Sequence, residues 1–142
     1  MKFILISLTI LATSFLWFAC KQTKYSAEKL PEKQIRWGNG GGFVGKESSH
    51  ILCDNGQIFN RDIAGNITEA KKTKAKNAKA LFKTIEGLGL AKMEFNHPGN
   101  LYNFIEFQEG DMVSRAVWGD KNYPADKSLE SLFRELDGLL KK

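Results

Sequence analysis

Apolar residues recur along this chain with two different periods, and the change of period separates strands from helices. Alternation of apolar and polar residues is typical of a strand with one buried face. Asn55-Gly56 indicates a tight hairpin turn, because Asn-Gly favours the positive φ angles of a type I′ turn. The pattern predicts strands at residues 35–37, 43–54, 57–61, 67–71, 101–108 and 112–118.

Two further stretches show the 3.6-residue period of helices that have one apolar face. The first predicted helix covers residues 74–88, and the second covers residues 127–140. Asp126 is the expected N-cap of the second helix. Gly89 is expected to end the first in a left-handed conformation, with Leu90 folded back on the helix as in a Schellman cap.

Between the helices, the chain is predicted to turn at residues 96–100, with Pro98 and Gly99 at the centre of a type II turn. The resulting order of elements is β-β-β-(β)-α-β-β-α. Antiparallel strands with helices on one face form an α+β domain. We therefore expect an antiparallel sheet of about five to six strands with two helices packed on one face.

The first residues have the pattern of an export signal. Met1-Lys2 is followed by an uncharged, mostly apolar run that ends at Lys21. This is the layout of a secretory signal peptide, and a single membrane span is the alternative. Residues 16–20, Leu-Trp-Phe-Ala-Cys, resemble a bacterial lipobox. The resemblance implies cleavage before Cys20 and attachment of lipid to its thiol; an ordinary signal peptide remains the other interpretation.

The chain is thus expected to divide into a signal at residues 1–19, a lipid anchor and tether at residues 20–33, and a single, monomeric domain at residues 34–142. The polar tether spans at most about 45 Å. This organisation predicts a protein of the bacterial cell envelope, at the periplasmic face or in the outer membrane, with the membrane as a partner through Cys20.

Charge and cysteine content change this picture only slightly. The whole chain carries +5, and removal of the signal takes away one lysine and leaves +4. A charge this modest does not indicate a nucleic-acid partner. Lipid on Cys20 would leave Cys53 without a partner in the chain, so Cys53 is expected to be a small buried side chain.

The densest charge run lies near the start of the first predicted helix. It contains Lys71, Lys72, Lys74, Lys76 and Lys79. A helix dipole disfavours cations at this end by a few tenths of a kcal/mol each. The run is either a solvated face or a contact for anionic lipid or another acidic surface near the anchor.

Residues 37–45 form a glycine-rich stretch, Trp-Gly-Asn-Gly-Gly-Gly-Phe-Val-Gly. Gly40, Gly42 and Gly45 match G-x-G-x-x-G, but a nucleotide site also needs a helix directly afterwards, and a strand pattern follows here. We therefore expect a bend or bulge between two paired strands. Aromatic residues near it either seal the core or form a binding rim. The candidate binding edge comprises Gly40, Gly41, Gly42, Phe43, Trp118 and His97.

The sequence does not predict a catalytic, metal or cofactor site. His50 and Cys53 are three apart on a strand, so they face opposite sides and do not predict a zinc site. Ser48, Ser49, His97 and Asp120 lack the local signature of a hydrolase triad. We expect a non-enzymatic binding module without a small-molecule cofactor; an enzyme with an unrecognised site is the alternative.

Several blocks of this sequence resemble an uncharacterised group of small lipoproteins from Bacteroidetes-type bacteria, a group without an assigned activity. The blocks are residues 38–45, 54–57, 95–100 and 117–119. Gly41-Gly42-Phe43-Val44-Gly45 and the order of elements are also similar to emfourin, a cystatin-like α+β inhibitor of thermolysin-like metalloproteases. Emfourins are compact cytoplasmic proteins without a lipobox, unlike this chain. This second resemblance implies a cystatin-like fold and a protease as partner.

Overall fold

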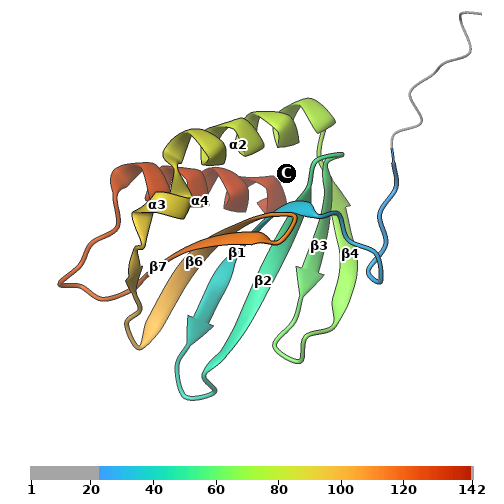
Figure 1. Ribbon diagram of the computed structural model, residues 1–142. Coiled ribbons are helices and arrows are strands. Elements are labelled where there is room, and N and C mark those ends of the chain that lie inside the picture. The colour runs from blue at the N-terminus through green and yellow to red at the C-terminus, as the bar shows by residue number, and fades with distance from the viewer. Residues whose placement is uncertain (1–22, 142) are drawn as a thin grey trace, which may run out of the picture.

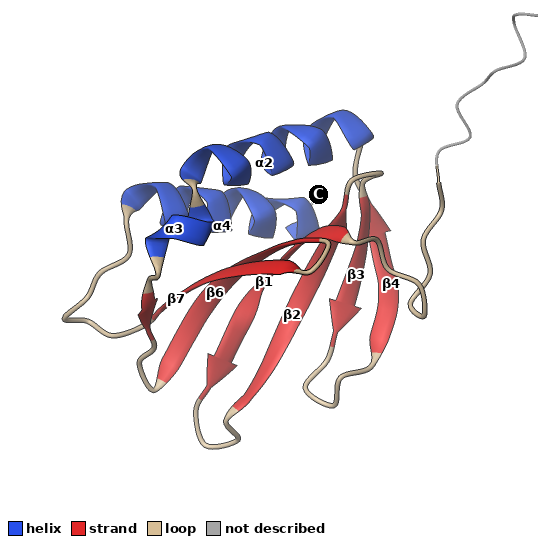
Figure 2. Cartoon of the chain, viewed as in Figure 1, coloured by secondary structure: helices blue, strands red, loops and turns tan. Residues whose placement is uncertain are grey.

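The computed structural model describes residues 23–141 and forms one curved sheet with helices over one face (Figure 1, Figure 2). The sheet has seven strands in the order β4-β3-β2-β1-β6-β7-β5. All neighbouring pairs are antiparallel except β5 with β7. The α+β fold class expected from the sequence is confirmed. The predicted signal peptide and Cys20 lie outside the described residues.

The elements follow one another in the predicted order, with two short additions, α3 and β5. They are β1 (Lys33–Gly41), β2 (Lys46–Cys53), β3 (Gln57–Arg61), β4 (Ile67–Lys72), α2 (Ala75–Leu88), α3 (Leu90–Met93), β5 (Asn96–His97), β6 (Leu101–Glu109), β7 (Met112–Trp118) and α4 (Lys127–Lys141). No helix among residues 23–141 combines the length and apolar character needed to cross a membrane.

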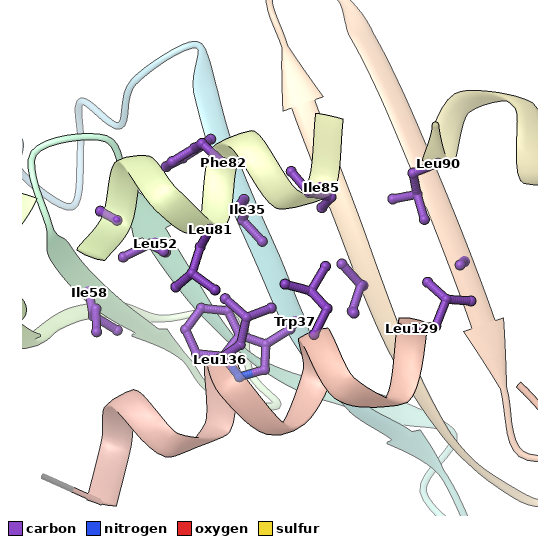
Figure 3. Packing of buried hydrophobic residues seen from close by; sticks show 14 of the residues in the cluster. Ile35, Trp37, Leu52, Ile58, Leu81, Phe82, Ile85, Leu90, Leu129 and Leu136 are labelled. Carbon is purple, nitrogen blue, oxygen red and sulfur yellow. The ribbon is translucent and has the colours of Figure 1, made fainter. Parts of the chain in front are cut away.

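The main core lies between the sheet and the two long helices (Figure 3). Ile35 and Trp37 of the central strand β1 are fully buried there. The helices contribute Ala78, Leu81, Phe82, Ile85, Leu129, Leu132 and Leu136, the apolar stripes that the sequence predicts. Each large side chain removed from water in this layer contributes about 1.5–3 kcal/mol.

The ends of both helices follow from local sequence. The Asp126 carboxylate accepts a hydrogen bond from the Ser128 backbone N–H at 2.7 Å, which caps α4 as predicted. Gly89 has φ 62° and ends α2, with its N–H bonded to the Glu86 carbonyl. The chain then enters α3, which the sequence did not predict. Lys74 precedes α2 without a side-chain cap.

The glycine-rich stretch differs from the expected bend. Strand β1 continues through Gly38 and Gly40 to Gly41, because these residues pair with β2 on one side and β6 on the other. The reversal is confined to residues 42–45, where Gly42 and Gly45 have positive φ. Hydrogen bonds from both neighbours thus hold glycines in a strand that their own propensity does not favour.

Two predicted turn types are wrong. Gly56 has φ 90°, but Asn55 does not have the positive φ that a type I′ turn requires. Gly99 also lacks the positive φ of a type II turn. There glycine is needed for space: an added Cβ would lie 2.5 Å from the Gly119 carbonyl oxygen. The same segment contains β5, which pairs with β7 at the sheet edge.

The sheet face opposite the helices, here called the open face, carries a second small cluster. Ile51, Cys53 and Phe59 are buried in it. Residues 23–32, here called the N-terminal strap, cross this face, and Tyr25 and Leu30 of the strap pack on the cluster. Most of the expected tether therefore lies against the domain.

Candidate functional site

Exposed apolar side chains gather where several strands end. The β1–β2, β3–β4 and β5–β6 turns lie at the same end of the sheet, at the bottom of Figure 1. We define the strand-end rim as four exposed residues from these turns and the adjoining start of β6. They are Phe43, Val44, Ile63 and Leu101, with exposed fractions of 109%, 63%, 57% and 69%.

A shallow groove of about 480 Å³ runs along this rim. Val44, Ile63 and Leu101 line it, and so do Gly40 and Gly41 of β1. Trp118 reaches the same groove from β7, although only 8% of its surface is exposed. Three residues of the predicted binding edge, the two glycines and Trp118, are therefore neighbours in space.

Most of the Trp118 side chain belongs to the core. Its ring meets Phe133 of α4 edge to face, with ring centroids 5.4 Å apart. Register within the sheet places Trp118 opposite Asn103, which also pairs with Asn39 of β1. This alignment brings a β7 residue to the end of β1, although β6 lies between them.

Each glycine of the edge has a structural reason. A Cβ on Gly40 would lie 2.7 Å from the Tyr102 ring and 2.8 Å from Glu47 Cγ. These two side chains are joined across it by a hydrogen bond of 2.9 Å from the Tyr102 hydroxyl to Glu47. Gly41 has φ 89° and faces the Asn100 carbonyl. Gly42 has φ 68° and donates its N–H to the same carbonyl at 2.6 Å.

Phe43 is the most exposed apolar residue of the described chain, with its ring wholly in solvent at the tip of the β1–β2 turn. His97 lies apart from it. It pairs with Trp118 through the backbone, but its ring stacks on Tyr123 with centroids 4.1 Å apart and planes 7° apart. His97 is therefore close to the edge in register, while its ring belongs to a separate aromatic contact.

The open face carries a network of ion pairs that the sequence did not predict. Arg36 and Arg115 both bind Glu106, at 3.0 and 3.1 Å. Arg115 also forms an ion pair with Glu47. The Arg115 guanidinium lies over the Phe104 ring, 4.0 Å from its centroid. The signal in the sequence was the opposite charge of Glu106 and Arg115, on two strands that were predicted to be joined by a tight turn.

The network changes the acidity of its members. Burial by itself raises the pKa of Glu47, but hydrogen bonds from Arg115 and Tyr102 and the nearby arginine charges outweigh burial and hold the pKa below its ordinary value. The pKa of Arg115 is raised, because its two carboxylate partners outweigh the opposing effect of burial. Both groups are therefore charged at neutral pH, and the network fits a structural cover of the sheet better than proton transfer.

The predicted lysine run divides into two parts. Lys71 donates from its Nζ to the Leu140 carbonyl at 3.3 Å, and it lines a groove between α2 and α4 together with Lys72 and Lys74. Lys74 and Lys76 are exposed at the start of α2. Lys74 thus belongs to both parts, whereas Lys71 is held by its hydrogen bond to α4.

The remaining polar candidates do not converge. His50 Nδ1 lies 2.7 Å from the Asn60 side chain, and Ser48 donates to Asn39 at 3.0 Å. Cys53 is buried on the opposite face of β2, and burial raises the pKa of its thiol to about 12. Among residues 23–141, no three His, Cys, Asp or Glu side chains come together as a metal site would require.

Comparison with known proteins leaves the geometry as the main guide to function. No family model matches the chain, and no curated protein matches it.

Proposed function

We propose that this protein is a lipid-anchored protein of the bacterial cell envelope, at the periplasmic face or in the outer membrane, and that it acts by binding a protein partner rather than by catalysis. Acylated Cys20 provides the anchor, and the strand-end rim provides the contact surface. The resemblance to small Bacteroidetes-type lipoproteins agrees with this organisation.

One observation carries the binding role: exposed apolar residues from the β1–β2 turn, the β3–β4 turn and the start of β6 line one groove, and Phe43 lies next in the chain to one of them, Val44. Single exposed apolar residues are ordinary, whereas a contiguous exposed patch is typical of an interaction site. Phe43 makes the strongest case. Its full exposure forgoes the roughly 1.5–3 kcal/mol that burial of such a side chain provides.

The test compares two matched double variants in the native envelope. Phe43→Ser with Leu101→Ser removes apolar surface from the rim. Met112→Ser with Val113→Ser removes it from the start of β7, where the exposed fractions are similar at 67% and 57%. Crosslinking and affinity capture should recover the same envelope protein with the wild type and the β7 control, and lose it with the rim variant. Equal recovery with both variants would reject the rim as the contact surface.

A separate test addresses the anchor. Cys20→Ser should release the protein from membranes or leave its precursor uncleaved, because the acylated thiol is missing. Unchanged fractionation and unchanged migration on a gel would rule out lipid attachment at this residue.

A second candidate function is inhibition of a protease, as the similarity to emfourin implies. The observation that favours it is the β1–β2 turn, where a glycine backbone and a wholly exposed Phe43 form a narrow projection. Such a projection suits insertion into a cleft, with the phenyl ring in an apolar subsite. Titration against thermolysin-like and papain-like proteases should then show stoichiometric slowing that Phe43→Ala relieves. No slowing of either class at micromolar protein would reject this candidate.

A further inference from the structure

The N-terminal strap fixes the point at which the chain enters the fold. The Thr23 carbonyl accepts a hydrogen bond from the Asn55 side chain at 2.6 Å. Tyr25 donates its backbone N–H to Gln57 at 2.7 Å and its hydroxyl to Asp54 at 2.8 Å. These bonds hold the first described residue beside the β2–β3 turn.

Three lysines lie near this entry point, with Lys74 and Lys76 on either side of Ala75 in the chain. Thr23 and Lys79 line the same small hollow, and Ala75, the first residue of α2, lies in its wall. We define the lysine corner as Lys74, Lys76 and Lys79. All three are exposed, and Lys76 and Lys79 share one side of α2 because they are three residues apart. Lys79 therefore places its charge next to the strap, and Lys76 lies on the same side of the helix.

The positive charge of the lysine corner lies near the end of α2 where the helix dipole is unfavourable to cations. The first turn of α2 contains no acidic residue, and Lys74 supplies no cap. Cations in the first turn of a helix are disfavoured, so the helix does not gain stability from Lys74 and Lys76. Within the described chain, none of the three lysines forms an ion pair with a carboxylate. Their charge is available to an external anionic surface.

We propose that the lysine corner rests on the anionic headgroups of the membrane that holds Cys20, so that the domain sits in one orientation. The inference depends on the lipid anchor proposed above and adds the face that meets the membrane. The proposed membrane contact comprises Lys74, Lys76 and Lys79. Lys71 is not included, because its Nζ donates a hydrogen bond to the Leu140 carbonyl.

Two lengths support the proposal. Cys20 is only three residues from Thr23, and an extended segment of that length spans at most about 10 Å. The Debye length is about 8–10 Å at physiological salt, so the anchor keeps the corner where headgroup charge is felt. Three lysines near an anionic surface then favour contact by roughly a hundredfold.

The opposite end of the molecule points away from the membrane in this orientation. The β2–β3 turn meets the strap, whereas the β1–β2 turn carries Phe43 at the other end of β2. Eight strand residues separate the two turns, a distance of about 26 Å. The strand-end rim therefore lies beyond the reach of headgroup charge and is accessible to a partner.

The experiment uses the full acylated protein in vesicles, with a fluorophore on one introduced thiol. Ala80→Cys places it on α2, and Ala64→Cys places it near the rim; both alanines are exposed. Cys53 is fully buried and does not compete for the label. Vesicles contain phosphatidylcholine alone or with phosphatidylglycerol, and a headgroup nitroxide acts as the quencher.

We expect strong quenching at position 80 and little at position 64 in the anionic vesicles only. Salt at about 1 M should abolish the difference, since it shortens the Debye length to about 3 Å. Charge reversal at Lys74, Lys76 and Lys79 should do the same. Reversal at Lys92, Lys121 and Lys127, which are also exposed, is the matched control and should leave it unchanged.

Equal quenching at both positions, or quenching that ignores lipid charge, would overturn the proposal. A corner that serves an acidic protein instead would give that result. If Cys20 carries no lipid, the result is different: the protein would not float with vesicles of phosphatidylcholine alone. Partner capture and quenching are independent results: loss of capture by the rim variant, with normal quenching, bears only on the proposed binding role.

Discussion

The two faces of the sheet are covered in different ways, although the same strands supply both. On one face, Trp37 and its neighbours lie dry under α2 and α4. On the other face, no long helix is present in the described chain. The ion pairs of Arg36 and Arg115 with Glu106 lie there, and Tyr25 and Leu30 of the strap pack on the small apolar cluster. The difference shows that a sheet can shield its second face with its own side chains. The rim is then one place where apolar side chains from several strand ends stay exposed.

The largest expected effect lies on the helix-covered face. Trp37→Ala should lower the free energy of unfolding by about 3–5 kcal/mol, because it leaves a large cavity in the core. Val113→Ala, at an exposed position of β7, should change it by less than about 0.5 kcal/mol. Urea unfolding measures both. A small loss at Trp37 would show that the helices are not the main support of the sheet.

Substitutions at the glycines of the binding edge, which lie outside both covered faces, should have the second largest effect on stability. Gly41→Ala should cost about 1–2 kcal/mol, because its φ is positive and the new methyl would meet the Asn100 carbonyl. Gly42→Ala should also destabilise, by about 1 kcal/mol. Gly45→Ala is the control, with positive φ but open space around it. Thermal melts decide; unchanged melting of Gly41→Ala with lost partner capture would make this glycine an interface residue.

Substitution of an ion-pair residue on the open face should have the smallest effect on stability, and this effect should depend on pH. The pKa of Glu47 is lower in the folded state than its ordinary value of 4.5, so its contribution is complete well above pH 4.5 and is lost as pH falls below it. Glu47→Gln should cost about 1 kcal/mol at pH 7 and much less at pH 3. Urea midpoints at the two values test this. An equal cost at both would mean that the Glu47 charge does not contribute.

Local patterns in the sequence predicted most of the elements. Both helices were found because the apolar residues repeat along each, and Asp126 and Gly89 marked ends that the structure confirms. The class of fold followed from the order of these elements. Such features depend on residues close together in the chain, which a single sequence displays directly.

Features set by distant contacts were missed or wrong. Strand β1 runs through its glycines because residues of β6, 60 to 66 positions later in the chain, pair with them. Gly99 is required by the Gly119 carbonyl, so its turn type could not be deduced from Pro-Gly alone. Strand β5 has two residues and no periodic pattern of its own.

The candidate site was predicted in part. Gly40, Gly41 and Trp118 were grouped from their positions at the ends of predicted strands, and the structure places them along one groove. Ile63 and Leu101 were not associated with them, because Ile63 lies in the β3–β4 turn and Leu101 at the start of β6, and only the pairing of the strands brings the two together. Their role in binding remains a prediction for the rim variants to test.

The central position of β1 also has a consequence for the order of folding. Arg36 pairs with Ile51 of β2 fifteen residues later, but with Glu106 of β6 only seventy residues later. Closing the longer loop costs roughly 1.4 kcal/mol more in chain entropy, which delays the second pairing about tenfold. Until β6 arrives, β1 is an open edge, the kind of surface on which chains aggregate. Its glycines at positions 38, 40 and 41 make that edge a poor template while it waits, since glycine pairs weakly and offers no side chain to pack.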